Sequence, residues 1–64
     1  MRLIVNGEEL ETKAVHVQAL VAELDHEGYV AVAVNEEIVS RRDWAATALN
    51  DGDAIEIITP RQGG

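Results

Sequence analysis

The sequence predicts an α+β domain in which a mixed sheet of four to five strands packs on one helix. Three observations support this prediction. An Asn-Gly pair joins two short extended segments, a later stretch has the apolar spacing of an amphipathic helix, and three further extended segments follow that helix. No linker, repeat or low-complexity segment interrupts the 64 residues. We therefore expect a single domain over residues 1–64.

A hairpin opens the chain. Residues 2–6 are extended in type, and Asn6-Gly7 predicts a type I′ turn because both central positions of that turn need positive φ. The return strand, residues 8–12, is polar except for Leu10, as expected of a strand with one solvated face. The core side of the hairpin is predicted to carry Leu3, Val5 and Leu10.

One amphipathic helix follows the hairpin. Its apolar positions have the i, i+3, i+4, i+7 spacing of a single helical face, and they are Val17, Leu20, Val21 and Leu24. Gly28 is predicted to end the helix, because glycine takes the left-handed conformation without a Cβ clash. His16 stands at the N-cap position but is not a preferred N-cap type, so we expect Thr12 or a water to satisfy the free N–H groups.

Residues 29–34 are predicted to form the third strand, with valine on one face and alanine on the other. Residues 35–37 then form a turn, and residues 38–39 form a short fourth strand. Residues 41–49 are predicted to be a compact segment with a helical turn, in which Trp44 fills the core.

The last strand, residues 54–59, follows a turn at residues 50–53 and is predicted to place Ile55 and Ile57 on the core side. The complete order is strand, strand, helix, strand, short strand, irregular turn, strand, which is the order of the ubiquitin-like β-grasp fold. The last strand can then lie parallel to the first at the centre of the sheet. Residues 60–64 begin with a proline, which cannot donate to the ladder, so we expect a flexible tail of roughly 17 Å when extended.

Composition disfavours several classes of function. The formal charge of −7 repels phosphate backbones and anionic lipid, so no nucleic-acid or membrane partner is expected. The chain has no cysteine, and therefore no disulfide, thiolate metal site or nucleophilic thiol. The apolar run at the start is too short for a signal peptide, and no stretch approaches the roughly 20 apolar residues that span a bilayer. A cytoplasmic protein is the simplest interpretation.

The chain ends in Gly63-Gly64, a pair expected by chance in roughly 0.5% of chains. Glycines also suit a frayed end, which is the alternative explanation. Two residues without Cβ let a slim tail enter a narrow partner site and present the final acyl carbon with no neighbouring side chain. A carboxylate accepts sulfur only after activation, for which adenylation by ATP is the usual route. The pattern therefore favours a terminal carboxylate that a partner enzyme activates.

Several segments together carry a resemblance that covers essentially the whole chain. They are residues 1–9, 17–20, 34–39 with Arg41 and Trp44, 51–53 before 55–58, and the terminal Gly63-Gly64. In this combination the sequence resembles the ThiS family of sulfur carriers in thiamine biosynthesis. Family members often have Thr or Ser in place of His16 and Pro in place of Ser40, which affects only local capping and turn geometry.

The resemblance implies a function for the tail. The carboxylate of Gly64 would be adenylated by a ubiquitin-activating-type enzyme that uses MgATP, and sulfur would arrive from a persulfide donor such as a cysteine desulfurase. The resulting thiocarboxylate would donate sulfur to thiazole synthase, with Arg61, Gln62 and Gly63 threading into the partner active sites. The chain is thus expected to be a protein cosubstrate rather than an enzyme. We expect it to be a monomer when free, with no catalytic residue and no bound cofactor.

Other functions remain open at the level of sequence. The small subunit of molybdopterin synthase, or the sulfur carrier of another pathway, shares the fold and tail, although such subunits tend to be longer. A ubiquitin-like modifier would instead form isopeptide bonds with lysines. A regulatory or RNA-binding β-grasp module does not need a terminal Gly-Gly, and the charge of −7 disfavours it.

Strand parity predicts a docking face. If the last strand points alternate side chains inward, Ile58 points outward, and it lies beside an outward Ile4 if the first and last strands pair. Together with Ala31 and Ala33 these residues could form an apolar patch that leads to the tail. The alternative is ordinary surface, since exposed isoleucine is common.

Two groups of polar residues resemble metal sites only superficially. One group is His16 and His26 with Asp25 and Glu27, whose histidine spacing matches no common ligand motif. The other is Asp51 and Asp53, which lack the rest of a calcium loop and suit a turn. We therefore predict no metal site.

Overall fold

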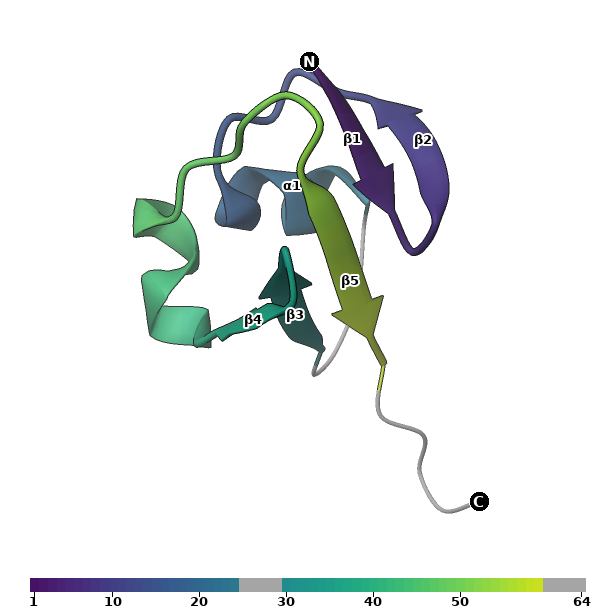
Figure 1. Cartoon of the computed structure of the whole chain (residues 1–64). Coiled ribbons are helices and arrows are strands. Elements are labelled where there is room, and N and C mark those ends of the chain that lie inside the picture. Colours follow the sequence, from purple (N-terminus) through teal and green to yellow (C-terminus); the bar gives the residue numbers. More distant parts are fainter. Residues whose placement is uncertain (25–29, 60–64) are drawn as a thin grey trace.

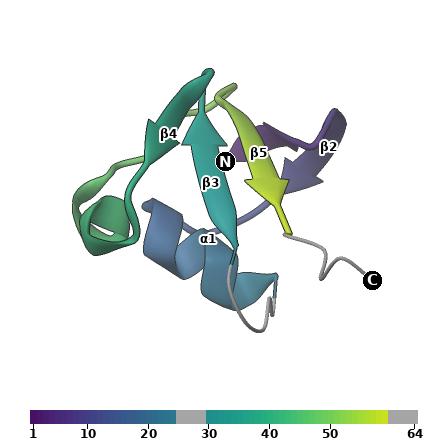
Figure 2. The same ribbon diagram turned by 90° about the horizontal axis from the view of Figure 1, so that it is seen from below.

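A computed structural model describes residues 1–24 and 30–59 of the chain, and it confirms the predicted mixed sheet over one helix. The five strands lie in the order β2-β1-β5-β3-β4, and α1 lies against one face of the sheet (Figures 1 and 2). β1 and β5 pair in parallel at the centre, and the other neighbouring strands are antiparallel. The elements are β1 (Arg2–Val5), β2 (Glu8–Glu11), α1 (Val17–Glu23), β3 (Ala31–Val34), β4 (Glu37–Val39), the 3₁₀ helix η1 (Arg41–Ala46) and β5 (Ala54–Ile58).

Two-residue turns close both hairpins. The φ angles are 51° at Asn6 and 85° at Gly7 in the first turn, and 50° at Asn35 and 75° at Glu36 in the second. Positive φ at both central positions defines a type I′ turn, whose twist matches that of the flanking strands. The first turn is confirmed. The second is one residue shorter than predicted, because Glu37 already pairs within β4.

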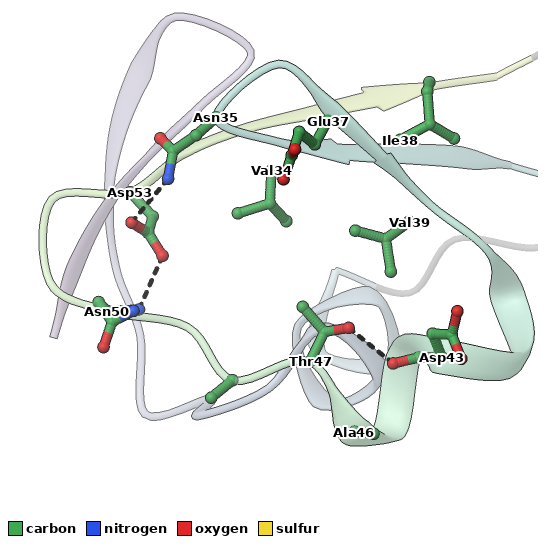
Figure 3. Close-up of a pocket in the computed structure, with 11 residues that line it drawn as sticks. Val34, Asn35, Glu37, Ile38, Val39, Asp43, Ala46, Thr47, Asn50 and Asp53 are labelled. Carbon is green, nitrogen blue, oxygen red and sulfur yellow. Dashed lines mark hydrogen bonds between the residues drawn. The ribbon is translucent and has the colours of Figure 1, made fainter.

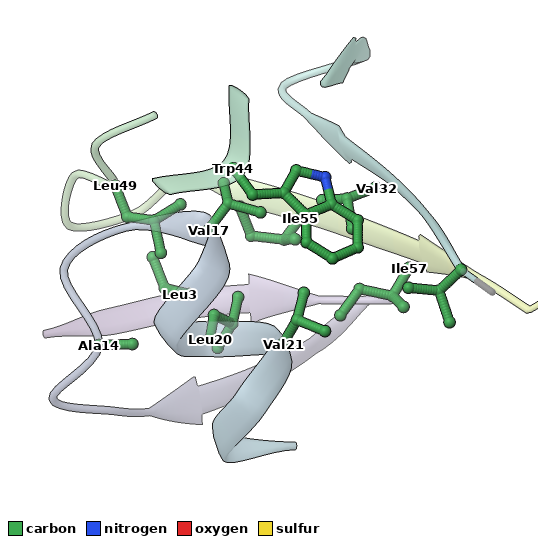
Figure 4. Packing of buried hydrophobic residues seen from close by; sticks show 11 residues of the cluster. Leu3, Ala14, Val17, Leu20, Val21, Val32, Trp44, Leu49, Ile55 and Ile57 are labelled. Carbon is green, nitrogen blue, oxygen red and sulfur yellow. The ribbon is translucent and has the colours of Figure 1, made fainter. Parts of the chain in front are cut away.

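The core fills the space between α1 and the inner face of the sheet (Figure 4). Its largest fully buried side chains are Leu3, Val17, Leu20, Val32 and Ile55. Each of them contributes about 1.5–3 kcal/mol through the apolar surface it removes from water. The inward positions predicted for the first and last strands are therefore confirmed.

Trp44 closes the core from the side of η1, as predicted. Its side chain is 5% exposed. The indole Nε1–H donates to the carbonyl of Val39 at 3.1 Å, so the one polar group of the ring is satisfied. Trp44 thereby joins η1 to the end of β4.

The start of α1 is capped by His16, although histidine is not a preferred N-cap type. Nδ1 of His16 accepts a hydrogen bond from the N–H of Ala19 at 3.2 Å, so the expectation that Thr12 or a water fills this role is wrong. An unprotonated imidazole nitrogen is an acceptor, and the extended backbone of His16 directs it at the first helical turn. Thr12 is engaged elsewhere, because its hydroxyl accepts from the N–H of Ala14 and donates to Glu23.

The far end of α1 is described only in part. The helix ends at Glu23 with Leu24 as its C-cap. The predicted end at Gly28 and the predicted strand start at residue 29 lie outside the described residues, and β3 begins at Ala31. None of the helices within residues 1–24 and 30–59 is long and apolar enough to cross a bilayer.

The segment after β4 is compact, as predicted, and returns to the start of α1. Beyond η1, the N–H of Val17 donates to the carbonyl of Thr47 at 3.0 Å, and the N–H of Leu49 donates to that of Val15 at 2.9 Å. These bonds fix the connection that leads into β5.

Candidate functional site

The candidate site is the tail together with the strand that carries it. Arg61, Gln62, Gly63 and Gly64 lie outside the described residues. The structure describes the strand that precedes them, β5, which is the central strand of the sheet. β3 pairs with β5 as far as Ile58, whereas β1 pairs only with Ala54 and Ile55 at the start of the strand.

Asn6 fastens the end of β5 that leads to the tail. Its side-chain Oδ1 accepts from the N–H of Ile57 at 2.9 Å, and its Nδ2 donates to the carbonyl of Ile57 at 3.4 Å. Its backbone N–H donates to the carbonyl of Ile55 at 2.8 Å. The side-chain amide of Asn6 thus forms with Ile57 the two hydrogen bonds that a further residue of β1 would form in the sheet. The sequence singles out Asn6 only as a turn residue, and its contact with β5 depends on the pairing of distant strands.

Asn35 fastens the start of the same strand. Its Oδ1 accepts from the N–H of Ala54 at 3.0 Å, and its own N–H donates to the carbonyl of Ala54 at 2.7 Å. Its Nδ2 donates to Oδ1 of Asp53 at 3.0 Å. The two asparagines therefore hold β5 at both ends, one from each turn.

The face of the sheet opposite α1 is the predicted docking face. The strand registers place on it Arg2, Ile4, Glu9, Glu11, Ala31, Ala33, Ile38, Ala54, Glu56 and Ile58. Ile58 is 51% exposed and Ile4 is 40% exposed. Both isoleucines face outward, as parity predicts.

The predicted neighbourhood of these isoleucines is wrong. The partner of Ile4 across the parallel pair is Ala54, four residues before Ile58, which is about 13 Å along the strand. The neighbour of Ile58 is Ala31. The error arises because parity fixes the face of a residue but not its register along the partner strand.

Ala33 also differs from the other members of the predicted patch. It is only 4% exposed, because its small side chain lies between the larger cross-strand partners Ile38 and Glu56. Ile38, which the prediction omitted, is 71% exposed and covers part of this surface. Its outward position follows from the pairing of β4 with β3.

The charges on this face are unevenly distributed. Arg2 lies 3.7 Å from both Glu9 and Glu11, and all three side chains are exposed, so each pair contributes at most about 1 kcal/mol. Glu56 lies between the apolar positions Ala54 and Ile58 on β5. The face is therefore acidic towards β2 and apolar towards β3 and β4.

A hollow of about 490 Å³ lies on the other side of β4, between the β3–β4 turn and η1 (Figure 3). Val34 and Val39 line its apolar wall. Both carboxylate oxygens of Asp53, which also lines the hollow, accept hydrogen bonds within the protein. Oδ1 accepts from Asn35 Nδ2, and Oδ2 accepts from the N–H of Asn50. This hollow lies at the start of β5, the end of the strand opposite to the one that leads to residue 60.

The polar residues considered as metal ligands have other roles where the structure describes them. Asp51 accepts from the N–H of Arg2 at 2.7 Å, and Asp53 fastens the turn before β5. His16 caps α1. Asp25, His26 and Glu27 lie outside the described residues.

Fold and site together define a class of protein: a small β-grasp domain whose central strand leads directly into a Gly-Gly tail. The ThiS family model matches residues 2–64. The chain belongs to the ThiS family.

Solved structures agree with this assignment along the whole chain. The crystal structure of the thiamine biosynthesis protein ThiS from Geobacter metallireducens is 33% identical, with a TM-score of 0.84 and full coverage of both chains. A solution structure of a thiamine biosynthesis protein from the same organism gives a TM-score of 0.83 at 33% identity, covering all of this chain and 88% of the other.

A curated relative differs in length. A thiazole synthase from Paramagnetospirillum magneticum is 44% identical over 66 residues, which cover all of this chain but 20% of the relative. The chain therefore spans one fifth of the curated relative that it matches.

Proposed function

We propose that this chain is the sulfur carrier for formation of thiazole phosphate in thiamine biosynthesis, with the carboxyl group of Gly64 as the carrying group. The observation that supports this most directly is the match to the ThiS family over residues 2–64. The whole-chain similarity to a solved thiamine biosynthesis protein supports it further. The chain acts as a protein cosubstrate in the cytoplasm, and its partners supply the catalysis.

The chemistry at Gly64 proceeds in two steps. A ubiquitin-activating-type enzyme joins the carboxylate to the α-phosphorus of MgATP, which forms an acyl adenylate and releases pyrophosphate. A sulfur nucleophile then attacks the acyl carbon and expels AMP. With a persulfide donor, such as that of a cysteine desulfurase, a thiol must afterwards reduce the acyl disulfide to release the thiocarboxylate. With free sulfide, the thiocarboxylate forms directly.

Thiazole synthase is the proposed acceptor of the sulfur. The supporting observation is that a protein named thiazole synthase contains a segment 44% identical to this entire chain. A carrier-like segment within one polypeptide keeps its partner at high effective concentration. A separate chain has to find the same partner by docking.

The decisive experiment is intact mass spectrometry of the chain after incubation with its adenylating enzyme, MgATP and sulfide. We expect a gain of about 16 Da, the exchange of one carboxyl oxygen for sulfur. A chain that lacks Gly64 should gain nothing. Isopeptide-linked conjugates to lysine in place of this gain would contradict the proposal and favour a ubiquitin-like modifier. Sulfur transfer to a molybdopterin precursor, but not to thiazole synthase, would favour the molybdopterin pathway.

The docking face belongs to the same proposal. Ile58 and Ala31 lie directly beside the strand end that leads to the tail, while Ala33 and Ile4 lie further along the sheet. An enzyme that accepts the tail must also cover the surface next to it. The apolar pair formed by Ile58 and Ala31 is therefore the proposed first contact.

Ile58→Glu tests this contact, with Val15→Glu as the matched control. Both side chains are exposed, at 51% and 59%, but Val15 lies just before α1 and away from the docking face. We expect Ile58→Glu to lower kcat/KM of adenylation about tenfold, because a carboxylate would be buried in an apolar contact. Val15→Glu should leave it unchanged. Equal effects of the two variants would remove Ile58 from the docking face.

A further inference from the structure

Arg41, the first residue of η1, differs from Arg2 on the outward face of the sheet in its charged neighbours. Arg2 lies 3.7 Å from two carboxylates, those of Glu9 and Glu11. Among residues 1–24 and 30–59, no carboxylate lies within ion-pair distance of the Arg41 guanidinium. The chain carries a net charge of −7, and yet this cation forms no ion pair with any of the described carboxylates.

Arg41 makes a cation–π contact instead. Its guanidinium carbon lies 5.5 Å from the centroid of the Trp44 ring. That ring is buried and fastened to the carbonyl of Val39. A guanidinium within about 6 Å of a ring centroid is attracted to the face of the ring, and its N–H groups can still donate to a carboxylate at its edge.

A hollow of about 270 Å³ opens beside this arginine. Its lining includes Arg41, Trp44, Ser40, Ile38 and Ala31. Ile38 is the most exposed large hydrophobic residue in the described part of the chain. Ala31 is the cross-strand neighbour of Ile58, so the hollow continues the docking face from β5 across β3 towards β4.

We propose that this hollow, with Arg41 at its rim, binds an aspartate or glutamate side chain on the surface of thiazole synthase, next to an apolar side chain that enters between Ile38 and Ala31. The charge argument selects a carboxylate, because the guanidinium lies over the Trp44 ring and has no anionic partner among the described residues. The apolar lining selects a side chain of a folded protein over a free anion.

This site rests on the proposed function, since the partner is the one that receives the sulfur. The competing explanation is structural: the contact of Arg41 with Trp44 only stabilises η1. A test must therefore measure affinity for the synthase separately from folding.

The first test is calorimetric titration of thiazole synthase, from the organism that encodes this chain, with three carrier variants. Arg41→Gln should weaken binding about tenfold, because it removes a charge-assisted hydrogen bond at a desolvated contact. Arg41→Lys should recover part of this loss, since an ammonium keeps the charge but not the planar fork. Arg42→Gln is the matched control, because Arg42 is adjacent, exposed and equally charged but makes no cation–π contact with Trp44. It should change the affinity less than about twofold.

The second test locates the carboxylate directly. Lys13 is the only lysine of the chain, so Arg41→Lys introduces a single new amine at the rim of the hollow. A carbodiimide joins an amine to a carboxylate only when the two are in contact. We expect mass spectrometry to show a cross-link from this new amine to an aspartate or glutamate of the synthase, and no equivalent cross-link from Arg42→Lys.

The outcomes separate the two levels of the proposal. If the wild-type carrier forms its thiocarboxylate and binds the synthase, but Arg41→Gln binds equally well while remaining folded by NMR, this inference fails and the proposed function stands. Equal weakening by Arg41→Gln and Arg42→Gln would also overturn it, since that result means general attraction of charge. If the wild-type carrier does not bind the synthase at all, both fail.

Discussion

The two hairpins of this domain share the same type of turn but have different outward surfaces. β1–β2 and β3–β4 each close through a type I′ turn, and each turn begins with an asparagine that reaches β5. They differ at the second turn position, which is Gly7 in one hairpin and Glu36 in the other. Their outward faces differ as well, since β2 carries glutamates while β3 and β4 carry alanine and isoleucine.

This difference separates the contacts that position β5 from the surface that we propose to bind a partner. Both hairpins contribute backbone-like bonds to β5, so the position of the strand that leads to the tail depends on both. Only the β3–β4 hairpin leaves its outward face apolar, and η1 with Arg41 follows it after Ser40. Substitutions in the turns should therefore change mainly the stability of the fold, and substitutions on the outward faces should change mainly the affinity for a partner.

The largest expected effect is that of Asn6→Ala. The change removes both side-chain bonds to Ile57, which are partly buried, and leaves alanine at φ 51°. We expect the free energy of unfolding to fall by about 2–4 kcal/mol. Urea denaturation monitored by circular dichroism measures this change.

Asn6→Asp provides the control for that prediction. Aspartate tolerates positive φ and keeps an acceptor for the N–H of Ile57, but it cannot donate to the carbonyl. It should lose clearly less stability than Asn6→Ala. If both variants unfold at the same urea concentration, the side-chain bonds to Ile57 contribute nothing measurable.

Asn35→Ala should have a smaller effect. Its side-chain bonds to Ala54 and Asp53 are solvent-exposed, whereas those of Asn6 are partly buried. Water replaces exposed bonds at little cost, so we expect a loss of about 1–2 kcal/mol, which includes the unfavourable positive φ of alanine. A loss equal to that of Asn6→Ala would mean that the two ends of β5 are held equally.

Much of this comparison could be predicted from sequence. The Asn-Gly pair fixes the first turn because few residue types accept positive φ, and the alternation in β3 and β5 fixes which side chains enter the core. The helical face follows from its spacing. These are local signals, and the structure confirms them.

The rest depends on contacts between distant parts of the chain. The register of β5 against β1 separates Ile58 from Ile4, and no local pattern encodes it. The bonds from Asn6 to Ile57 span 51 positions. Residue type alone does not predict the N-cap role of His16, because histidine is rarely an N-cap, whereas its extended backbone lets Nδ1 reach Ala19.

Gly7→Ala isolates the cost of backbone conformation in the first turn. A Cβ at this position would meet nothing within 4 Å, so no steric clash with the rest of the protein contributes. The φ of 85° alone is unfavourable for an L residue, and we expect a loss of about 1 kcal/mol in urea denaturation. A neutral result would show that the turn relaxes, and an amide chemical-shift change in β1 and β2 would then be visible by NMR.

Glu36→Gly is the reverse experiment on the second hairpin and should have the smallest effect. Glutamate at φ 75° carries a conformational cost of about 1–2 kcal/mol that glycine would relieve. Glycine also adds about 0.4–1 kcal/mol of entropy to the unfolded chain, which offsets part of the gain. We expect a net stabilisation of roughly 0.5 kcal/mol, small but opposite in sign to the effect of Gly7→Ala. Destabilisation by Glu36→Gly would mean that the glutamate side chain itself stabilises the fold, and Glu36→Gln would then show whether its charge is responsible.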